Sequence, residues 1–543
     1  MERSWWNYEL HKRKIVSFSL LLVFLWSLTS INWNKDLFHS GGLNTAKQIG
    51  AAIFSPDLSN DILLLALESS LTTLSYAVAG MSLALVIAFF WGILASGVLF
   101  SISKNNRYVK RFFRGHLGFM RAIHELVWAW LFVASIGLSP FAAIFALAIP
   151  YGGILGKIFA DMLEDVRTEP IKALEAAGAG KWQTLMYGYL PMVRASIVSY
   201  AMYRFECAVR SSAIMSFVGI GGLGYQIQLS LDDLQYNQVW TFVFFLIFLV
   251  LLIDMWSNFL RNQLTSVNRA IKQLKTSVFL MILLLIGSWL SIFTIENANL
   301  SAVFTKENLH YTIQFFKGLI GIGEDQPAFL SSESWANALS LTWETLLMSI
   351  IATGFATIAA IFTMVPAARN VADGSLTLAK KWHGWLSFGM VRSGYIFTRA
   401  VPELIWAMII IFVFKPGILP GAIALALHNY GILGKLLAEV IEDLDSRPIR
   451  NLASCGANKI QILLLGVLPA TLPRFLTYIL YRWEVIMRTT IVVGFVGAGG
   501  LGQQFKLSMS FFHYTDITLF LFFYLVLVYA ADFISEKVRL VIK

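Results

Sequence analysis

Charged residues are scarce in this chain. Asp, Glu, Lys and Arg together make up only 14% of its 543 residues, whereas a soluble globular domain carries about 25%. Apolar side chains account for 57% of the chain, and the mean hydropathy is +0.67. So little charge excludes an ordinary water-soluble domain, and so apolar a composition is typical of a chain that lies in a lipid bilayer.

Cysteine is scarcer still. Its two copies, Cys207 in a predicted span and Cys455 in a predicted cytoplasmic segment, exclude a disulfide framework. The eight histidines form no metal-ligand pattern, and no Ser-His-Asp or Cys-His constellation stands out. We therefore predict a protein that is not an enzyme and that holds no metal and no cofactor of its own.

A G-x-x-x-x-G-K-[S/T] phosphate loop is also lacking. The nearest match, residues 152–157, has the wrong spacing and no Ser or Thr after the lysine. Residues 219–224 (GIGGLG) satisfy G-x-G-x-x-G, but a dinucleotide site needs that pattern after a strand of a soluble βαβ unit, and here it follows an apolar span. The sequence therefore predicts no nucleotide site in this chain.

Long apolar stretches, by contrast, are abundant. Each covers about 20 residues, which is enough to cross a hydrocarbon core of ~30 Å. They lie near residues 15–32, 72–100, 117–138, 141–160, 187–213, 238–260, 277–296, 339–365, 388–414, 418–438, 465–491 and 515–535. We predict an all-α polytopic membrane protein with about 12 transmembrane helices, in two six-span modules (1–260 and 277–543) joined by a cytoplasmic linker (261–276).

Basic residues are placed unevenly along this pattern. They gather before the first span, after the second, in the linker and at the end of the chain, and Lys and Arg are retained on the cytoplasmic side of a membrane. Residues 225–237 carry Asp232 and Asp233 but no Lys or Arg. We expect both termini in the cytoplasm and the two modules as parallel repeats. The net charge of +10 then reflects membrane orientation, and nucleic-acid binding is not expected.

The two modules repeat each other at a constant offset in residue number. Residues 121–129 (RAIHELVWA) recur as 399–407 (RAVPELIWA), and 153–157 (GILGK) recur unchanged at 431–435. Residues 203–210 (YRFECAVR) recur as 481–488 (YRWEVIMR). The same offset holds without a gap from Arg121 to Gly224, which indicates a duplicated membrane module, and two homologous modules imply one shared pathway.

A polar segment separates the fourth and fifth spans of each module, at residues 164–191 and 442–469. Acidic residues followed by Pro170 or Pro448 mark a helix start, and Gly178 and Gly456 suit a helix end or a tight turn. We predict a short helix, a turn and a second helix at the cytoplasmic face. Such a segment either fits a groove on a partner protein or rests on lipid headgroups, and its spacing does not decide between the two.

The short helix, the Gly-Ala turn and the trailing Leu-Pro resemble the coupling-helix motif of permease subunits in binding-protein-dependent ATP-binding-cassette (ABC) importers. The run from Arg121 or Arg399 to Gly224 or Gly502 is similar to the phosphonate-type importer permease, with its Tyr-Arg-x-Glu-x-x-x-Arg and Phe-Val-Gly-x-Gly-Gly-Leu-Gly blocks. This resemblance covers most of the second module and the core of the first. It implies a type I ABC importer permease fold, with two permease modules fused in one chain.

The resemblance also implies the partners. They are two copies of an ATPase subunit, which uses the ATP, an extracytoplasmic substrate-binding protein, and the lipid bilayer of the bacterial inner membrane. Contact with the ATPase would fall on Ala173, Leu174, Gly178, Ala179, Leu452, Gly456 and Ala457. The family usually has an acidic residue six positions before the motif glycine, where this chain has Lys172 and Arg450. The charge presented to the ATPase is thereby reversed, although Glu175 can compensate in the first module.

Charged residues lie inside the third and fifth spans of both modules. At that depth each costs about 2.5 to 3.5 kcal/mol, so they should face the bundle interior or a water-filled path. Arg and Glu four residues apart on a helix can pair, which leaves two interpretations, an anion path or buried ion pairs that lock helices together. We expect a mixture, with Arg204 and Arg482 on the path. The candidate substrate-path residues are Arg121, Glu125, Arg204, Glu206, Arg210, Arg399, Glu403, Arg482, Glu484 and Arg488.

Two further features remain open from sequence alone. The glycine-rich segment after the fifth span either makes a structural bend or offers backbone amides to a passing anion; its candidate outer-gate residues are Gly219, Gly221, Gly222, Gly224, Gly497, Gly499, Gly500 and Gly502. His124 stands beside Glu125, but Pro402 occupies the equivalent position. We therefore predict a packing or hydrogen-bonding role for His124, one that the duplicated mechanism does not require.

The predicted function is ATP-driven import by alternating access of phosphonate or a related phosphorus oxyanion such as phosphite, hypophosphite or phosphate. One alternative is an ABC importer permease for another small solute. Another is a twelve-span secondary transporter driven by an ion gradient, which would have no reason to keep two matched cytoplasmic segments. A third is a membrane scaffold that transports nothing.

Overall fold

The computed structural model describes residues 2–31, 37–39, 41–100, 104–265, 271–296, 298–324, 326–376 and 382–542. These residues are almost entirely helical, and the only β-bridge among them joins Phe38 to Phe414. The predicted all-α membrane fold is confirmed. Contacts between residues divide the chain into two compact units, residues 50–318 and residues 1–49 together with 319–543.

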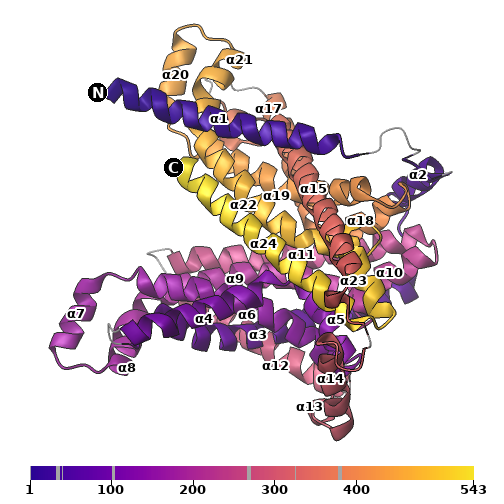
Figure 1. Cartoon of the computed structure of the whole chain (residues 1–543). Helices are drawn as coiled ribbons and strands as arrows, with labels where there is room; N and C mark the ends of the chain where they lie inside the picture. The colour runs from indigo at the N-terminus through magenta and orange to yellow at the C-terminus, as the bar shows by residue number, and fades with distance from the viewer. Residues whose placement is uncertain are drawn as a thin grey trace. The chain divides into compact units, whose positions relative to one another are not determined.

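The unit of residues 50–318 is a helix bundle centred on α3 and α6 (Figure 1). Its main helices are α3 (Asn60–Ser96), α4 (Lys104–Ala122), α5 (Glu125–Ile136), α6 (Pro140–Glu164), α9 (Leu190–Met215), α10 (Leu223–Asp232), α11 (Tyr236–Thr265) and α12 (Ile271–Thr294). Along α3, Ala77, Ala84 and Ala88 are fully buried. A Cβ on Gly92 would lie 2.9 Å from the carbonyl oxygen of Gly156 in α6. Such small residues let two membrane helices approach closely.

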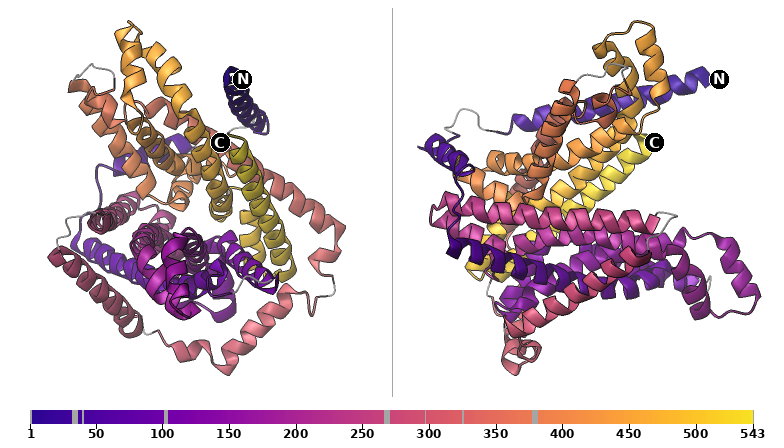
Figure 2. Two further views of the ribbon diagram at one scale, coloured as in Figure 1. Left: turned by 90° about the vertical axis from the view of Figure 1, so that its left-hand side faces the viewer. Right: turned by 180° about the vertical axis from the view of Figure 1, so that it is seen from behind.

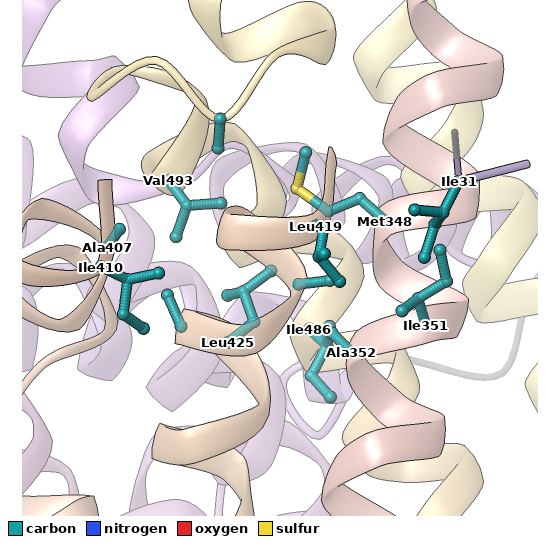
Figure 3. Close-up of a cluster of buried hydrophobic side chains, with 13 residues drawn as sticks. Ile31, Met348, Ile351, Ala352, Ala407, Ile410, Leu419, Leu425, Ile486 and Val493 are labelled. Carbon is teal, nitrogen blue, oxygen red and sulfur yellow. The ribbon is translucent and has the colours of Figure 1, made fainter. Parts of the chain in front are cut away.

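The second unit repeats this arrangement with the following helices: α15 (Ser332–Thr363), α17 (Trp382–Ala400), α18 (Glu403–Ile411), α19 (Ile418–Glu442), α22 (Leu468–Gly494), α23 (Gly500–Ser510) and α24 (Tyr514–Ile542). Figure 3 shows one of its buried apolar clusters, in which Met348 and Ile351 of α15 meet Leu419 and Leu425 of α19. Ile486 and Val493 of α22 close the cluster. The long helices of the unit are thus held together by aliphatic packing.

Helix α1 (Glu2–Leu28) belongs to the second unit, although it is the first helix of the chain. It packs against α15, α22 and α24 (Figure 2). The ring of Phe24 fills the space beside Gly354, where an added Cβ would come within 1.9 Å of it. In the same way α12, which opens the predicted second module, packs on α3 of the first unit.

The compact units therefore exchange the first helix of each predicted module, and they divide the chain elsewhere than at 1–260 and 277–543. Those modules were inferred from the sequence repeat, which contacts between residues do not test, and they remain a prediction. Of the predicted linker 261–276, α11 covers the part up to Thr265 and α12 begins at Ile271. Residues 266–270 lie outside the described residues.

The apolar helices agree with the predicted spans. Among the described residues, eight helices are long and apolar enough to cross a membrane, and the number rises to 11 when three bent helix pairs are each taken as one span. The shorter apolar helix Ile15–Leu28 lies in the first predicted span. The prediction of about 12 spans is therefore consistent with the structure in both number and position.

The predicted third span of each module is not a straight helix. α4 and α5 meet at 87°, and α17 and α18 meet at 89°. The apolar stretches 117–138 and 388–414 each predict a continuous helix, and this prediction is wrong. Pro402 precedes α18 as its N-cap, and His124 holds the same place before α5, so both sites favour the start of a new helix.

Candidate functional site

The buried carboxylate of the fifth span forms an ion pair with the sixth span. In α9, Glu206 is 4% exposed, and its Oε1 lies 3.1 Å from Nη2 of Arg261 in α11. In α22, Glu484 lies 2.7 Å from Arg539 in α24. Neither carboxylate forms an ion pair with the arginine one turn along its own helix, so the pairing that the spacing allows with Arg210 or Arg488 is not the one formed.

The reason is that the sixth span presents its own polar row to these helices. We define the sixth-span polar row as Asp254, Ser257 and Arg261 in α11, and Asp532, Ser535 and Arg539 in α24. The spacing of three and four positions places each set on one helix face. The two sets are related by the same offset as the sequence repeat, so extending the repeat beyond Gly502 would have found them. They supply the ion-pair partners of Glu206, Glu484 and Arg488.

The equivalent arginines Arg210 and Arg488 differ in their partners. Arg488 donates from Nη2 to both carboxylate oxygens of Asp532, at 2.6 and 2.8 Å. Arg210 forms no such ion pair with any described residue, and its buried Nε has no hydrogen-bond acceptor. The same residue types are therefore held in two different arrangements in the two units.

Arg204 and Arg482, the residues expected on the substrate path, both donate to neutral oxygens. Nε and Nη2 of Arg204 lie 3.0 and 2.8 Å from the hydroxyl of Tyr200. The same guanidinium lies over the rings of Tyr200 and Tyr203. Nε of Arg482 donates to Oδ1 of Asn429 at 3.0 Å, and Nη2 of Arg482 contacts the same oxygen. The hydroxyl and the amide orient each guanidinium and carry no charge of their own.

The glutamate of the third span starts a short helix in both units. Glu125 begins α5 and Glu403 begins α18, whereas Arg121 and Arg399 lie in the last turns of α4 and α17. The bend falls between these residues, so they do not lie one turn apart on a single straight helix. Oε1 of Glu125 accepts instead a 2.5 Å hydrogen bond from the hydroxyl of Ser211 in α9.

A histidine lies against each of these glutamates. Nε2 of His124 is 3.6 Å from Glu125, and Nε2 of His428 is 3.5 Å from Glu403. His124 also accepts the backbone N–H of Leu126 at 3.2 Å, so the expected hydrogen-bonding role is confirmed. His428, in α19, is not singled out by any pattern in the sequence.

The glycine-rich segment bends sharply and is fastened to the neighbouring helix. Gly219, Gly221 and Gly222 have φ between +85° and +92°, which favours glycine. The corresponding glycines of the other unit also have positive φ: Gly497, Gly499 and Gly500. An added Cβ on Gly224 would come within 1.9 Å of the carbonyl oxygen of Ala213, and one on Gly502 within 2.2 Å of that of Ile491.

The backbone amides of this segment already have acceptors in the protein. Leu223 donates to Thr73 at 2.9 Å, and Leu501 donates to Thr345 at 3.0 Å. Gly500 donates to a carboxylate oxygen of Glu344 at 3.3 Å. These contacts favour a structural bend over direct anion binding by these three amides.

The predicted cytoplasmic segments fold as expected. α7 (Thr168–Ala176) and α20 (Ser446–Ser454) are short helices, and Gly178 and Gly456 follow them with φ of +88° and +85°. Ala179 donates to the carbonyl of Leu174, and Ala457 to that of Leu452, which closes each helix end. Each segment protrudes from one end of its unit (Figure 2). We call α7 and α20, with the turns that follow them, the coupling segments.

Each coupling segment rests on a glycine that sequence reasoning missed. Gly188 lies in the π-helical turn Leu185–Tyr189, and its equivalent Gly466 lies in the π-helical turn Ile462–Val467. A Cβ on Gly188 would lie 2.8 Å from Ile171 and 3.0 Å from Leu174. A Cβ on Gly466 would lie 3.1 Å from Leu452. The apolar side of the segment therefore packs directly on the base of the fifth span.

The substituted charges of the coupling segments differ in their surroundings. Arg450 donates to the carbonyl oxygen of Ser375 at 2.9 and 2.7 Å. Lys172 is exposed. Glu175, expected to compensate for Lys172, forms a 2.6 Å ion pair with Lys181. Its ion-pair partner is therefore Lys181, which begins α8 just after the turn.

An ion pair stands at the base of each coupling segment. Nη2 of Arg114 in α4 lies 2.5 Å from Glu164, the last residue of α6. Nη2 of Arg392 in α17 lies 2.7 Å from Glu442, the last residue of α19. In the sequence these acidic residues indicate only a helix start. The structure shows that they also tie the third span to the fourth.

Comparison with known families shows two matches to one family model. The model described as "Binding-protein-dependent transport system inner membrane component" matches residues 88–266 and again residues 374–538. Both matches contain a coupling segment, a fifth span with its charges and a glycine-rich bend. Together they cover more than half of the chain.

Three curated proteins are similar in sequence. The phosphate-import permease protein PhnE of Mycolicibacterium smegmatis is 28% identical over 78% of this chain and 77% of its own length. The phosphite transport system permease protein PtxC of Stutzerimonas stutzeri is 36% identical over 39% of this chain and 73% of its own. The putative cryptic phosphonate transport system permease protein PhnE2 of Escherichia coli is 37% identical over 22% and 96%.

One solved structure also matches, that of the MetNI methionine ABC transporter in inward-facing conformations. The TM-score is 0.32 and the sequence identity 17%, over 38% of this chain and 99% of that one.

Proposed function

Since this chain belongs to the family of binding-protein-dependent transport system inner membrane components, we propose that it imports a phosphorus oxyanion using ATP hydrolysed by separate subunits. The chain is a multi-pass membrane protein with two permease modules. The observation that carries the proposal is the pair of coupling segments, which recur at the same place in both modules. A permease that is driven by two copies of a separate ATPase subunit needs one such contact surface in each module.

The coupling segments are built to transmit force. Each one packs on the fifth span through Gly188 or Gly466. Each also follows a helix end that an arginine ties to the third span. Movement of the segment would therefore shift three spans of its unit together, which is the requirement of alternating access. A transporter driven by an ion gradient has no use for this surface.

The substrate class is proposed from charge and from the named relatives. Arg204 and Arg482 place guanidinium groups within the fifth spans, and such groups bind phosphate-like oxyanions through paired N–H donors. The relatives are named for import of phosphate, phosphite and phosphonate. We propose that Arg204 and Arg482 contact this anion as it passes, and that the carboxylates Glu206 and Glu484 hold the spans in register.

The proposed assembly contains two copies of an ATPase, one docked at each coupling segment, and a substrate-binding protein outside the cell. The distribution of Lys and Arg favours cytoplasmic termini. The glycine-rich bends then face the outside, where they fix the ends of α9 and α22. The external binding protein would do most of the substrate selection.

Transport by the purified complex tests the proposal. The chain is reconstituted in vesicles with its ATPase, with ATP enclosed on the side of the coupling segments and the loaded binding protein added on the opposite side. Uptake of labelled methylphosphonate, phosphite and phosphate is then measured. We expect uptake only when ATP, ATPase and binding protein are all present. Uptake driven by a proton or sodium gradient without ATP would favour a secondary transporter instead.

A panel of binding proteins tests the substrate class separately. ATP hydrolysis by the complex should be stimulated by binding proteins loaded with a phosphorus oxyanion. Stimulation only by binding proteins loaded with an amino acid or a sugar would support the importer mechanism but contradict the proposed phosphorus oxyanion substrate. No stimulation and no uptake of any solute would leave the scaffold alternative.

A further inference from the structure

Both units place an imidazole against the glutamate that follows the bend of the third span. The two Nε2-to-carboxylate distances, 3.6 Å for His124 and 3.5 Å for His428, are nearly equal. Both histidines are buried, with 7% and 8% of their surface exposed. Burying an imidazole is costly unless the ring has hydrogen-bond or ion-pair partners, and here it has both the backbone of the bend and the carboxylate.

The two histidines do not occupy equivalent positions. His124 lies in the bend before α5, and its equivalent in the second module is Pro402. His428 lies inside α19, and its equivalent in the first module is Pro150, inside α6. One module thus carries His then Pro, and the other carries Pro then His. The repeat has exchanged the two residues and kept the contact with glutamate.

Backbone requirements do not explain this exchange. Proline suits position 402, because the N-cap residue of a helix needs no intrahelical N–H bond. Proline at position 150 is unfavourable, because it removes a hydrogen bond inside α6 and costs about 3 kcal/mol in an ordinary helix. What the two modules share at these positions is therefore the imidazole and not the backbone geometry.

Both rings join the same two features. Nδ1 of His124 accepts the N–H of Leu126, and Nδ1 of His428 lies 2.9 Å from the carbonyl oxygen of Val401, which can only accept. Leu126 and Val401 both flank the bend. In each unit one ring nitrogen is therefore bonded to the backbone of the bend, and the other faces the glutamate. The two rings are bonded in opposite senses: His124 can turn an Nε2–H toward Glu125 as a neutral ring, whereas His428 attracts Glu403 through Nε2 only as an imidazolium.

The glutamate held in this way connects the helices of the first unit. Glu125 accepts the hydroxyl of Ser211 in α9, and Ser211 is also 2.9 Å from the hydroxyl of Tyr151 in α6. A carboxylate that turned away from His124 would release this bridge. The bridge joins α5, α6 and α9, which include the fourth and fifth spans on either side of α7.

We infer that each module requires one imidazole between the bend of its third span and the glutamate after it, and that either of two positions, 124/402 or 150/428, supplies it. His124 and His428 are positioning residues: they orient Glu125 and Glu403. The role in transport rests on the proposed function, whereas the exchange of positions stands on the contacts alone.

The test moves the histidine of the first module to the place it has in the second. The single variant His124→Pro introduces a residue that the second module tolerates at this position, but it leaves Glu125 without this imidazole. The double variant His124→Pro with Pro150→His restores an imidazole from α6. Pro150→His alone and the exposed His310→Ala are the controls.

We expect His124→Pro to reduce ATP-driven uptake by at least tenfold through its maximal rate, with little change in the half-saturating concentration of loaded binding protein. The double variant should recover to within about threefold of the parent chain, and both controls should stay near it. Rescue from a non-equivalent position is a result that generic loss of packing does not produce. A double variant no better than His124→Pro, or full uptake by His124→Pro itself, would overturn the inference.

Thermal unfolding of the purified chains separates this inference from the proposed function. His124→Pro should unfold at a lower temperature than the parent chain. Adding Pro150→His should raise the midpoint more than adding Pro150→Ala, which removes the same proline from α6 without supplying an imidazole. This comparison can be made even if the parent chain transports none of the tested anions. Should His124→Pro fail to accumulate, His124→Ala, alone and with Pro150→His, replaces it under the same criteria; equal midpoints for those two variants would again overturn the inference.

Discussion

At the scale of single residues, the carboxylates of the fifth spans show how a buried charge finds its partner. Glu484 pairs with Arg539 on another helix, and not with Arg488, one turn away on its own. Removing one member of a buried pair leaves the other charge without compensation, whereas removing both can be nearly neutral. The two residues should therefore behave as a coupled unit.

A double-mutant cycle measures this coupling. Glu484→Gln and Arg539→Gln should each lower the free energy of unfolding by about 1 to 3 kcal/mol, and the double variant should lose less than their sum. Denaturant unfolding in detergent provides the values. The exposed pair Asp445 and Arg447 is the control, and its cycle should show no measurable coupling. Additive effects at 484 and 539 would contradict the structural pairing.

The arginines of the proposed path allow a second prediction. Replacing Arg204 and Arg482 together by Gln should reduce uptake at least tenfold, because the anion loses its two charged contacts, while the amount of folded complex stays unchanged. Uptake and size-exclusion profiles check the two parts. Arg194→Gln, elsewhere on α9, serves as the control. Normal uptake by the double variant would remove both arginines from the path.

Residues also show what sequence reasoning reaches and what it does not. The charges at 204, 206 and 210 are visible because they lie in an apolar stretch. Their partners are not, because the spacing of residues along one helix does not say which face meets another helix. Asp254 and Arg261 were within reach, since both recur at the equivalent positions of the second module. The matching roles of His124 and His428 could not be found in this way, because the two histidines do not occupy equivalent positions of the repeat.

At the scale of elements, the short helices α10 and α23 depend on glycine for their contact with the fifth spans. The side-chain position of Gly224 is already filled by the carbonyl of Ala213, and that of Gly502 by the carbonyl of Ile491. A methyl group at either place would push the helix away from its support. The glycines of this segment are therefore needed for close helix packing, independently of any contact with the substrate.

Alanine substitution tests this contact. Gly224→Ala and Gly502→Ala should each destabilise the protein by several kcal/mol or prevent it from accumulating, because overpacking against backbone cannot be relieved by a rotamer change. Gly389→Ala in α17, where nothing lies within 4 Å of the added Cβ, should be neutral or stabilising by roughly 1 kcal/mol. Membrane yield and thermal unfolding report the difference. Equal behaviour of all three variants would refute the packing argument.

The coupling segments give the second prediction at this scale. Gly178→Glu and Gly456→Glu should leave the chain folded, because no atom lies within 4 Å of the added Cβ, but should uncouple ATP hydrolysis from uptake. Gly323→Glu has a similar positive φ and equally open surroundings outside these segments, so it controls for backbone strain. ATPase activity stimulated by the loaded binding protein is the measurement. Normal stimulation in both coupling variants would contradict the assignment.

Elements are predicted well where one property dominates. Apolar length alone places α3, α6, α15 and α19, since hydrocarbon thickness imposes that length. The right-angle bends in the third spans were missed because the apolar stretches 117–138 and 388–414 run through the break and no glycine stands at it. Pro402 is a visible signal, but its counterpart His124 conceals the equivalence.

At the scale of the whole molecule, the exchange of first helices makes the two halves of the chain depend on each other. A fragment of residues 271–543 lacks α1, which covers Gly354 in its own unit. A fragment of residues 1–265 lacks α12, which packs on α3. We expect neither fragment to be stable alone and both to co-purify when they are produced together.

Co-expression of the two fragments tests this dependence. Each should be degraded when produced by itself, and the pair should recover at least half of the uptake of the intact chain. Deleting residues 2–28 from the first fragment should abolish the recovery of the second. A second fragment that accumulates equally well without α1 would contradict the exchange.

The position of α1 also sets an order of events during biosynthesis. Phe24 leaves the ribosome long before Gly354, its packing partner, has been synthesised. At translation rates of about 5 to 20 residues per second, that interval lasts roughly 15 to 65 seconds. Throughout it, α1 has no docking site on α15, so this packing contact joins a segment that is made early to one that is made much later.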